Sequence, residues 1–88
     1  MIRKRVQVSG TVQGVFYRDS CRRLAVEQNV AGWVRNLPDG RVEAVFEGTP
    51  AAVERLVNWS RRGPSQALVT MVAVHDEPAE GLSSFEIR

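Results

Sequence analysis

Residues Gly10-Thr-Val-Gln-Gly-Val-Phe-Tyr-Arg18 join two segments whose hydrophobic side chains repeat with different periods. Before this stretch, residues 3–10 alternate apolar and polar side chains, which predicts a β-strand with one buried face. After it, Cys21 and Leu24 lie at helical spacing and predict a helix over residues 18–28. A glycine-marked loop that leads into a helix is a candidate anion cradle, because the first turn of a helix has unpaired N–H groups and the positive end of the dipole.

Arg18 stands at the start of this predicted helix. A positive charge near the positive end of the dipole is unfavourable by about 0.3–1 kcal/mol when exposed, so an anion bound by both groups would explain its position. Gly14 would let the backbone approach such an anion without a Cβ in the way. The alternative is an exposed arginine, with Asp19 in the same turn compensating the dipole. The loop alone leaves both interpretations open.

Length and composition predict one globular domain over residues 1–88. Hydrophobic residues make up 43% and charged residues 25% of the chain, which is ordinary for a folded protein. Twelve Lys and Arg against ten Asp and Glu give a formal net charge of +2. This weak bias fits small anionic metabolites better than an extended nucleic-acid surface. We therefore expect no nucleic-acid partner, and we expect the protein to be a monomer.

The cysteine content and the first residues of the chain indicate the compartment. A single cysteine excludes an intrachain disulfide. Met1-Ile2-Arg3-Lys4-Arg5 leads into alternating residues instead of an apolar signal segment. No apolar run approaches the roughly 18 residues that a membrane span needs. We therefore expect a cytoplasmic protein with no membrane partner.

A β-hairpin is predicted in the middle of the chain. Leu37-Pro38-Asp39-Gly40 is a turn signal, because proline presets φ, aspartate tolerates the bridge region and glycine accepts a positive φ. Residues 31–36 and 41–47 are then the two strands of the hairpin. Alternate residues of the second strand are apolar, namely Val42, Ala44 and Phe46. This alternation indicates a sheet that helices cover on one side only.

The second half of the chain begins with a helix signal. Thr49 is a good N-cap and Pro50 suits the first helical position. Gly63-Pro64 is expected to end this helix.

Two further strands complete the predicted fold. The mostly apolar run over residues 68–74 predicts a strand with both faces buried. Residues 83–88 add a short fifth strand, with Phe85 and Ile87 pointing inward. The order βαββαβ with this optional strand predicts an α+β sandwich, an antiparallel sheet with two helices on one face.

Other residues that often carry chemistry have structural explanations here. Cys21 is not part of a cysteine-x5-arginine phosphatase loop, since the position six residues on is Glu27, and we interpret it as a small buried residue. His75 is the only histidine, so a histidine metal cluster or a Ser-His-Asp triad lacks parts, and we expect it to be exposed. Trp33 and Trp59 are interpreted as packing residues.

An RNA-binding role is the main alternative that uses the same element order. The basic pairs Arg22-Arg23 and Arg61-Arg62 are interpreted as solvated helix surface and not as a nucleic-acid track. An RNA-recognition domain needs aromatic residues on the exposed face of its central strands. The predicted strand 41–47 carries Arg41, Glu43, Val45 and Glu47 on that face, which argues against RNA.

Asn36 places a polar amide at the end of a predicted strand, directly before the tight turn. It shares a strand face with Val34, which we expect to point to the core, so its amide would be half-buried and need partners. One interpretation is a side chain that caps the turn. The other is an amide that holds a water molecule.

Taken together, Gly10–Arg18, Gly32-Trp-Val-Arg-Asn36, the Asp39-Gly40 turn and Glu43 closely resemble the acylphosphatase family. Three further places match and extend the resemblance over nearly the whole chain: Gly48, Gly63-Pro64 and Phe85-Glu-Ile-Arg88. The resemblance implies a ferredoxin-like sandwich that hydrolyses the carboxyl-phosphate bond of acyl phosphates without a metal or cofactor. The products are a carboxylate and inorganic phosphate.

The resemblance also implies roles for individual residues. By position, Arg18 corresponds to the phosphate-binding arginine of the family and Asn36 to its water-orienting asparagine. The phosphate cradle corresponds to the backbone of five residues, Thr11, Val12, Gln13, Gly14 and Val15. Leu37, where animal members tend to have threonine, is a small departure outside this set.

The chemistry of an acyl phosphate fits these residues. It is an activated mixed anhydride, so an enzyme can rely on positioning and charge stabilisation. Arg18 would hold two phosphate oxygens in a bidentate fork. No Asp, Glu or His is obviously placed as a base, so our hypothesis is that a phosphate oxygen of the substrate takes the water's proton. A non-catalytic phosphate-binding module would keep Arg18 and would not need Asn36, so the presence of both favours an enzyme.

Overall fold

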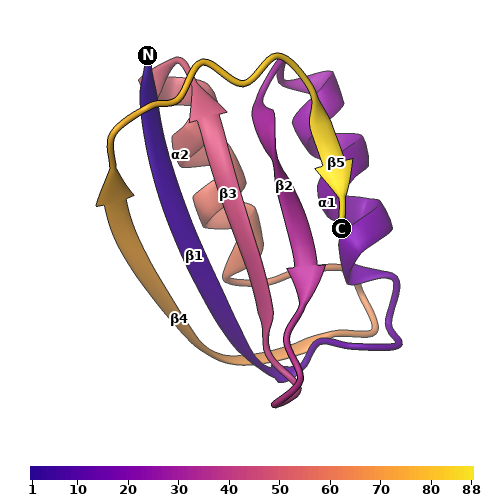
Figure 1. The fold of residues 1–88 in the computed structure, drawn as a ribbon. Helices are drawn as coiled ribbons and strands as arrows, with labels where there is room; N and C mark the ends of the chain where they lie inside the picture. Colours follow the sequence, from indigo (N-terminus) through magenta and orange to yellow (C-terminus); the bar gives the residue numbers. More distant parts are fainter.

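Two helices cover one face of a five-stranded sheet in the computed structural model, which describes residues 1–88 (Figure 1). The strands lie side by side in the order β4-β1-β3-β2-β5. Along the chain the elements are β1 (Ile2–Thr11), α1 (Tyr17–Glu27), β2 (Ala31–Asn36), β3 (Val42–Gly48), α2 (Pro50–Ser60), β4 (Leu68–Glu77) and β5 (Phe85–Ile87). This order confirms the predicted α+β sandwich with its short fifth strand.

The predicted hairpin is formed by β2 and β3. Leu37 N donates to Arg41 O at 2.8 Å, and Asp39 Oδ1 accepts a hydrogen bond from Arg41 N at 3.1 Å. Asn36 is the last residue of β2 and pairs with Val42. The turn therefore leaves Asn36 at the same end of the sheet as the loop between β1 and α1 (Figure 1).

The helices begin in different ways. At α2, Thr49 Oγ1 accepts a hydrogen bond from Ala52 N at 3.3 Å, and Pro50 is the first helical residue, as predicted. At α1 no side chain caps the helix, and the N-cap residue Phe16 has a left-handed backbone with φ 63°. Gly63, with φ 69°, follows the end of α2. Neither helix has the length and apolar content to cross a membrane.

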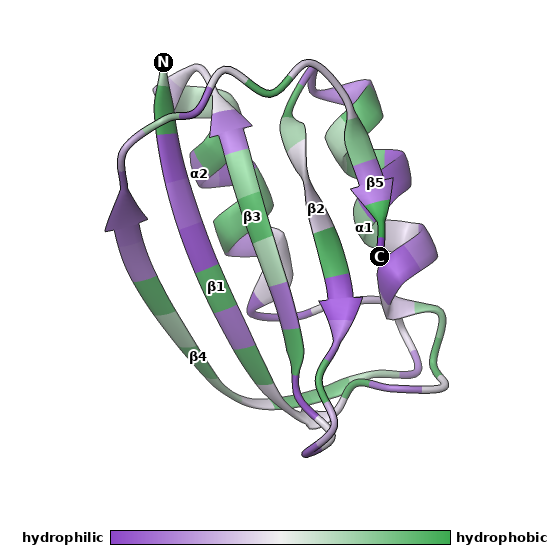
Figure 2. Ribbon diagram, viewed as in Figure 1, coloured by the Kyte–Doolittle hydropathy of each residue, from purple (hydrophilic) through white to green (hydrophobic).

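The core lies between the helices and the sheet, where the strands and helices contribute hydrophobic residues (Figure 2). Val6, Phe46 and Leu56 are fully buried at its centre. Cys21 is also fully buried, which confirms the interpretation of this cysteine as a packing residue. Burial raises the pKa of the Cys21 thiol, so the reactive thiolate is disfavoured.

Two expectations about the outer strands were wrong. β5 pairs with β2 in parallel, so the sheet is mixed and not wholly antiparallel. The reason is topological, because the chain crosses from β4 at one edge to β5 at the other before it pairs (Figure 1). β4 has no fully buried residue, although residues 68–74 predicted two buried faces. As an edge strand it pairs only with β1, and α2 packs mainly on β1 and β3.

One of the two side chains of β5 that were predicted to point inward does not do so. Phe85 is buried and stacks on Phe46 with 6.1 Å between ring centroids, as the inward orientation predicted. Ile87 is 42% exposed, so the same expectation was wrong for this residue. β5 is only three residues long, and Ile87 at its end borders a cavity instead of the core.

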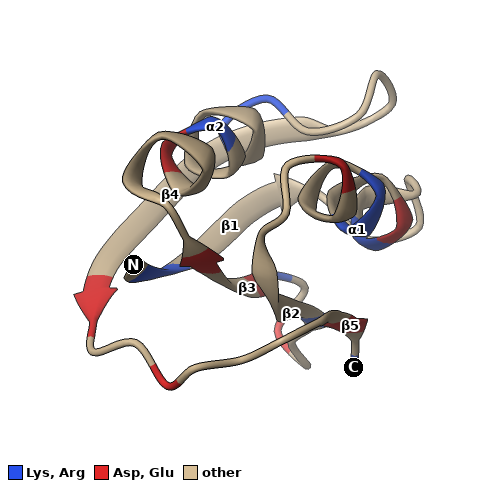
Figure 3. Ribbon diagram, turned by 90° about the horizontal axis from the view of Figure 1, so that it is seen from above, with Lys and Arg blue, Asp and Glu red and all other residues tan.

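The sheet face opposite the helices is closed by charged side chains, although alternation in β3 predicted an open face. Glu43 and Glu47 are only 4% and 1% exposed. Arg35 Nη2 lies 2.7 Å from Glu43 Oε1, and Arg3 Nη1 lies 2.8 Å from Glu47 Oε2. The segment from β4 to β5 crosses on this side (Figure 3), and backbone N–H groups of residues 80–82 donate to Glu47.

Candidate active site

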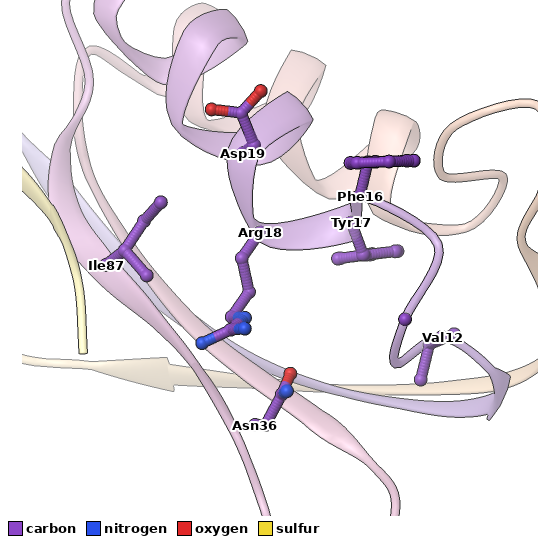
Figure 4. A pocket seen from close by; sticks show the side chains of 8 residues that line it. Val12, Phe16, Tyr17, Arg18, Asp19, Asn36 and Ile87 are labelled. Carbon is purple, nitrogen blue, oxygen red and sulfur yellow. The ribbon is translucent and has the colours of Figure 1, made fainter.

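A cavity of about 320 Å³ opens where α1 begins, beside the end of β2 (Figure 4). Its walls come from the loop after β1, the first turn of α1, the last residue of β2 and the last of β5. The lining residues are Val12, Gly14, Phe16, Tyr17, Arg18, Asp19, Asn36 and Ile87. The structure thus brings the two predicted catalytic side chains, Arg18 and Asn36, to one cavity.

Arg18 is the second residue of α1 and is half-buried. Its side chain extends from the helix start towards Asn36 (Figure 4). Arg18 takes part in none of the ion pairs of the chain. Asp19 pairs instead with Arg23, with 3.1 Å between Oδ2 and Nε. The guanidinium donors of Arg18 are therefore free for a ligand, which supports the anion-site interpretation.

The loop between β1 and α1 presents free backbone donors. The N–H groups of residues 12–15 make none of the backbone hydrogen bonds found outside helices and strands. Gly14 has φ 74°, and a Cβ at this position would meet no atom within 4 Å, so the loop is open on this side. Val12 and Val15 are buried and anchor the loop on the core. A firmly held loop with several free N–H groups suits an anion.

Three residues of the predicted cradle, Thr11, Gln13 and Val15, do not border the cavity. Thr11 is the last residue of β1 and pairs with Leu68 of β4, so it holds the base of the loop. The side chain of Gln13 turns towards the hairpin, where Nε2 donates to Leu37 O at 2.9 Å and to Arg41 O at 3.0 Å. The sequence predicted a role only for the backbone of Gln13. Its side-chain hydrogen bonds could not be predicted, because no local pattern indicates a contact between residues 24 positions apart.

Asn36 carries an unsatisfied buried acceptor. Val34 on the same strand face is fully buried, as predicted, and Asn36 itself is half-buried. Asn36 Oδ1 is buried and has no hydrogen-bond partner. The hairpin turn that Asn36 could have capped is instead capped by Asp39 and braced by Gln13. Buried polar atoms are nearly always paired, so the free oxygen fits an amide that holds a ligand or water.

The other side chains that the sequence singled out lie at packing or surface positions. His75 is exposed on β4. Trp59 packs on Tyr17 with 5.0 Å between ring centroids. Trp33 is 7% exposed, and the guanidinium carbons of Arg5, Arg35 and Arg88 lie 5.0–5.4 Å from its ring centroid. The pairs Arg22-Arg23 and Arg61-Arg62 are exposed. No group of three or more His, Cys, Asp or Glu residues lies close enough to hold a metal ion.

Comparison with known proteins shows the family to which the chain belongs. The family model for acylphosphatase matches residues 4–87. The acylphosphatase of Gloeobacter violaceus is 58% identical over 86 residues, which cover 98% of this chain and 92% of that protein. The acylphosphatase of Rubrobacter xylanophilus is 60% identical over 87 residues, which cover 98% of this chain and 79% of that protein. The crystal structure of acylphosphatase from Bacillus subtilis has a TM-score of 0.96 at 36% identity, covering 100% of this chain and 99% of that one. The chain therefore belongs to the acylphosphatase family.

Proposed function

We propose that this protein hydrolyses the carboxyl-phosphate bond of acyl phosphates, with Arg18 and the backbone of residues 11–15 binding the phosphate and Asn36 orienting the attacking water. The observation that carries the proposal is the unpartnered, buried Oδ1 of Asn36 in the cavity that Arg18 also lines. Leaving a buried acceptor unpaired is unfavourable by about 1–3 kcal/mol. A module that only bound phosphate would gain nothing from this arrangement.

Phosphate binding follows from the free donors at the start of α1. The guanidinium of Arg18 donates to two phosphate oxygens in a bidentate fork, which a lysine cannot reproduce. The N–H groups around Gly14 and the positive end of the α1 dipole hold the remaining charge. These groups are fixed before the substrate binds, so they stabilise charge that develops in the transition state without reorganisation.

Asn36 positions the attacking water molecule. Its Oδ1 accepts a hydrogen bond from one water proton, and this directs a lone pair of the water oxygen at phosphorus. A new P–O bond forms from the water, and the bridging P–O bond breaks with its electron pair leaving on the carboxylate oxygen. The activated leaving group makes this displacement feasible by positioning and charge stabilisation alone.

A phosphate oxygen of the substrate takes the proton that the water loses. Asp19 is the only carboxylate that borders the cavity. It is paired with Arg23 at 3.1 Å, and it lies on the far side of Arg18 from Asn36 (Figure 4). Neither the ion pair nor this position suits a general base for a water held by Asn36.

Hydrolysis of acetyl phosphate in water enriched in ¹⁸O tests the proposal. Attack at phosphorus places the label in inorganic phosphate and leaves acetate unlabelled. Label in acetate would mean attack at the carbonyl carbon, which contradicts the role given to Asn36. The uncatalysed reaction and the Arg18→Ala variant are run in parallel, and turnover no faster than theirs would show a phosphate binder without activity.

The proposal also includes the setting in which the protein works, as a monomer in the cytoplasm without a nucleic-acid partner. A free, fully buried Cys21 suits a reducing compartment. The exposed face that an RNA-recognition domain would fill with aromatic residues carries Glu43 and Glu47 in ion pairs on β3. Small acyl phosphates, which need only the cavity at Arg18, fit this chain better than a polymer.

A further inference from the structure

A second cavity, of about 540 Å³, lies where α1 meets α2. It shares no lining residue with the cavity at Arg18, so the two cavities are separate. Its lining includes Leu24 of α1, Arg55 and Trp59 of α2, and Arg61 and Arg62 directly after α2. We call this second cavity the interhelix groove.

The groove gathers basic side chains that have no acidic partner. Five Lys or Arg side chains of the chain take part in no ion pair, namely Arg18, Arg22, Arg55, Arg61 and Arg62. Three of these five line the groove, and no carboxylate lines it. Arg55 Nη1 donates to Gln28 Oε1 at 3.0 Å, but this partner is a neutral amide. Three positive charges therefore meet in one place without a negative charge among them.

The dipole of α2 accounts for part of this cluster only. Arg61 and Arg62 follow the end of the helix, where the dipole favours cations. The negative end of a helix amounts to about half an elementary charge, which two arginines exceed. Arg55 lies in the middle of Pro50–Ser60, and the dipole effect falls off within the last turn. The cluster thus retains a positive charge that suits an anion with more than one negative charge.

Trp59 adds an aromatic surface beside these charges. Its ring packs on Tyr17 with 5.0 Å between centroids, and the residue is half-buried, so part of its surface borders the groove. Leu24, also half-buried, adds an apolar surface from α1. An inorganic anion would use neither surface. A flat aromatic group would stack on the indole while guanidinium groups hold its charged part, so the lining fits an anion that carries an aromatic ring.

We propose that the interhelix groove is a second binding site, which takes a nucleoside triphosphate or an anion of the same chemistry. Its phosphates lie on Arg55, Arg61 and Arg62, and its base stacks against Trp59. The volume of the groove is within the range of about 300–1,000 Å³ that is usual for small-ligand sites. The charge is confined to three residues, which suits a small ligand better than a strand of nucleic acid. This site uses none of the residues of the proposed hydrolysis and does not depend on it.

Calorimetric titration of the Arg18→Ala variant with ATP, in a buffer without phosphate or divalent cations, tests the proposal. Removal of Arg18 excludes the cavity at that residue as a second phosphate site. One ATP should bind per chain. Tripolyphosphate, which lacks the base, should bind about tenfold more weakly, as loss of one base–aromatic stack implies. Adenosine, which lacks the phosphates, should give no saturable binding.

Substitutions on the two helices locate the bound ATP. In the same background, Arg55→Gln and Arg62→Gln should each raise the Kd for ATP about fivefold, which is the upper end for an exposed charge pair, and the double variant should raise it about twentyfold. Arg22→Gln is the matched control, because Arg22 is an exposed, unpaired arginine on α1 that does not line the groove. Its Kd should equal that of the background protein.

Fluorescence tests the contact with the ring. Trp33→Phe leaves Trp59 as the only tryptophan of the chain. Circular dichroism checks that this variant is folded, and Trp59→Phe, which keeps an aromatic ring on Tyr17, is its counterpart for calorimetry. ATP should quench the emission of Trp59 with the calorimetric Kd, and tripolyphosphate should quench it much less. Trp59→Phe should bind ATP more weakly and tripolyphosphate equally well.

Four results would overturn the proposal. The first is no saturable binding of ATP up to about 1 mM, which would mean that the groove holds no such ligand. The second is equal affinity for ATP and tripolyphosphate, which would leave Trp59 without a role. The third is an equal loss of affinity in Arg22→Gln, which would indicate general charge attraction. The fourth is a single-stranded oligonucleotide that binds more tightly than ATP with the same dependence on Arg55 and Arg62, which would assign the groove to nucleic acid.

Discussion

Gln13 on the loop after β1 donates a hydrogen bond from Nε2 to the main-chain oxygen of Leu37 at 2.9 Å. Leu37 directly follows Asn36 in the chain. The Gln13 side chain therefore links the loop with the free N–H groups to the backbone directly after Asn36, whose Oδ1 has no partner. Catalysis by positioning depends on such ties, since a displacement of about 1 Å can reduce the rate about a hundredfold.

Gln13→Leu keeps the size of this side chain and removes its two hydrogen bonds. We expect kcat for acetyl phosphate to fall at least tenfold, because the cradle and Asn36 are no longer held in register. Stability should fall by about 1–2 kcal/mol, as carbonyl groups of the turn lose their partner. Steady-state kinetics on protein shown to be folded by circular dichroism measures the first effect, and urea unfolding the second.

Gln7→Leu is the matched control for this variant. Gln7 Nε2 also donates to another part of the chain, Glu43 Oε2 at 2.9 Å, and it lies on the sheet face opposite the helices. Its loss should change stability and leave kcat unaltered. Equal kcat values for the Gln13 and Gln7 variants would show that the bond from Gln13 to Leu37 has no part in positioning.

Inorganic phosphate should stabilise the fold and inhibit competitively, because it occupies the same donors as the substrate. At a hundred times its dissociation constant it should add about 2.7 kcal/mol to the free energy of unfolding. Thermal unfolding with phosphate, compared with chloride at equal ionic strength, measures this. Arg18→Ala should lose the shift, whereas Arg22→Ala, an exposed arginine on the same helix, should keep it. A melting temperature that does not change with phosphate would mean that phosphate does not bind at this site.

Hydrolysis should proceed unchanged in the presence of a chelator. Arg18, the free N–H groups of residues 12–15 and the dipole of α1 supply positive charge at the site, which is the role a metal ion has in many phosphoryl-transfer enzymes. The check is turnover of acetyl phosphate before and after dialysis against EDTA. Activity that disappears on dialysis and returns with added magnesium or zinc would contradict the proposed mechanism.

The buried carboxylate of Glu47 predicts how stability depends on pH. Burial opposes its ionisation, but the guanidinium of Arg3 and three backbone N–H groups outweigh burial and lower the pKa of Glu47 below its ordinary value of 4.5. A lowered pKa means that the stabilising contribution is present above pH 4.5 and is lost as pH falls through the folded value. The urea midpoint should therefore decline steadily from about pH 4.5 downwards.

Glu47→Gln should lower stability at pH 7 and weaken this dependence, because a neutral amide does not titrate and leaves Arg3 with a poorer partner. Glu54→Gln, which changes an exposed carboxylate on α2, is the control and should leave the dependence intact. If Glu47→Gln follows the wild-type pH profile, other carboxylates are responsible for the acid sensitivity.

Local signals were sufficient for most of the fold. Residues 31–36 predicted β2 with its observed bounds, and Thr49 caps α2 as expected. Such features depend on neighbouring residues and are readable from the sequence. The errors concern β4 and β5, whose burial and pairing depend on where the whole chain places them. An apolar run does not reveal that its strand will lie at the edge of a sheet.

In the candidate site, too, only residues with a local signal could be predicted from the sequence. Arg18 and Asn36 could be proposed from the sequence because each breaks a local rule, a cation at a helix start and an amide on a core-facing strand position. The hydrogen bonds of Gln13 and the position of Ile87 beside Arg18 come from contacts between distant segments. Phe16 gave no signal, because its left-handed backbone is a property of the folded loop.

Paired measurements of phosphate inhibition and kcat on Arg18→Ala and Asn36→Ala separate phosphate binding by Arg18 from positioning of water by Asn36. Arg18→Ala should lose both, because the guanidinium contacts the anion before and during reaction. Asn36→Ala should lose about a hundredfold to a thousandfold in kcat, by analogy with removal of one oxyanion-hole donor, and keep the phosphate inhibition constant within a factor of about two. Asn58→Ala, an exposed asparagine on α2, should match wild type in both. Folded Asn36→Ala protein that turns over acetyl phosphate at the wild-type rate would contradict the role of Asn36 in positioning water.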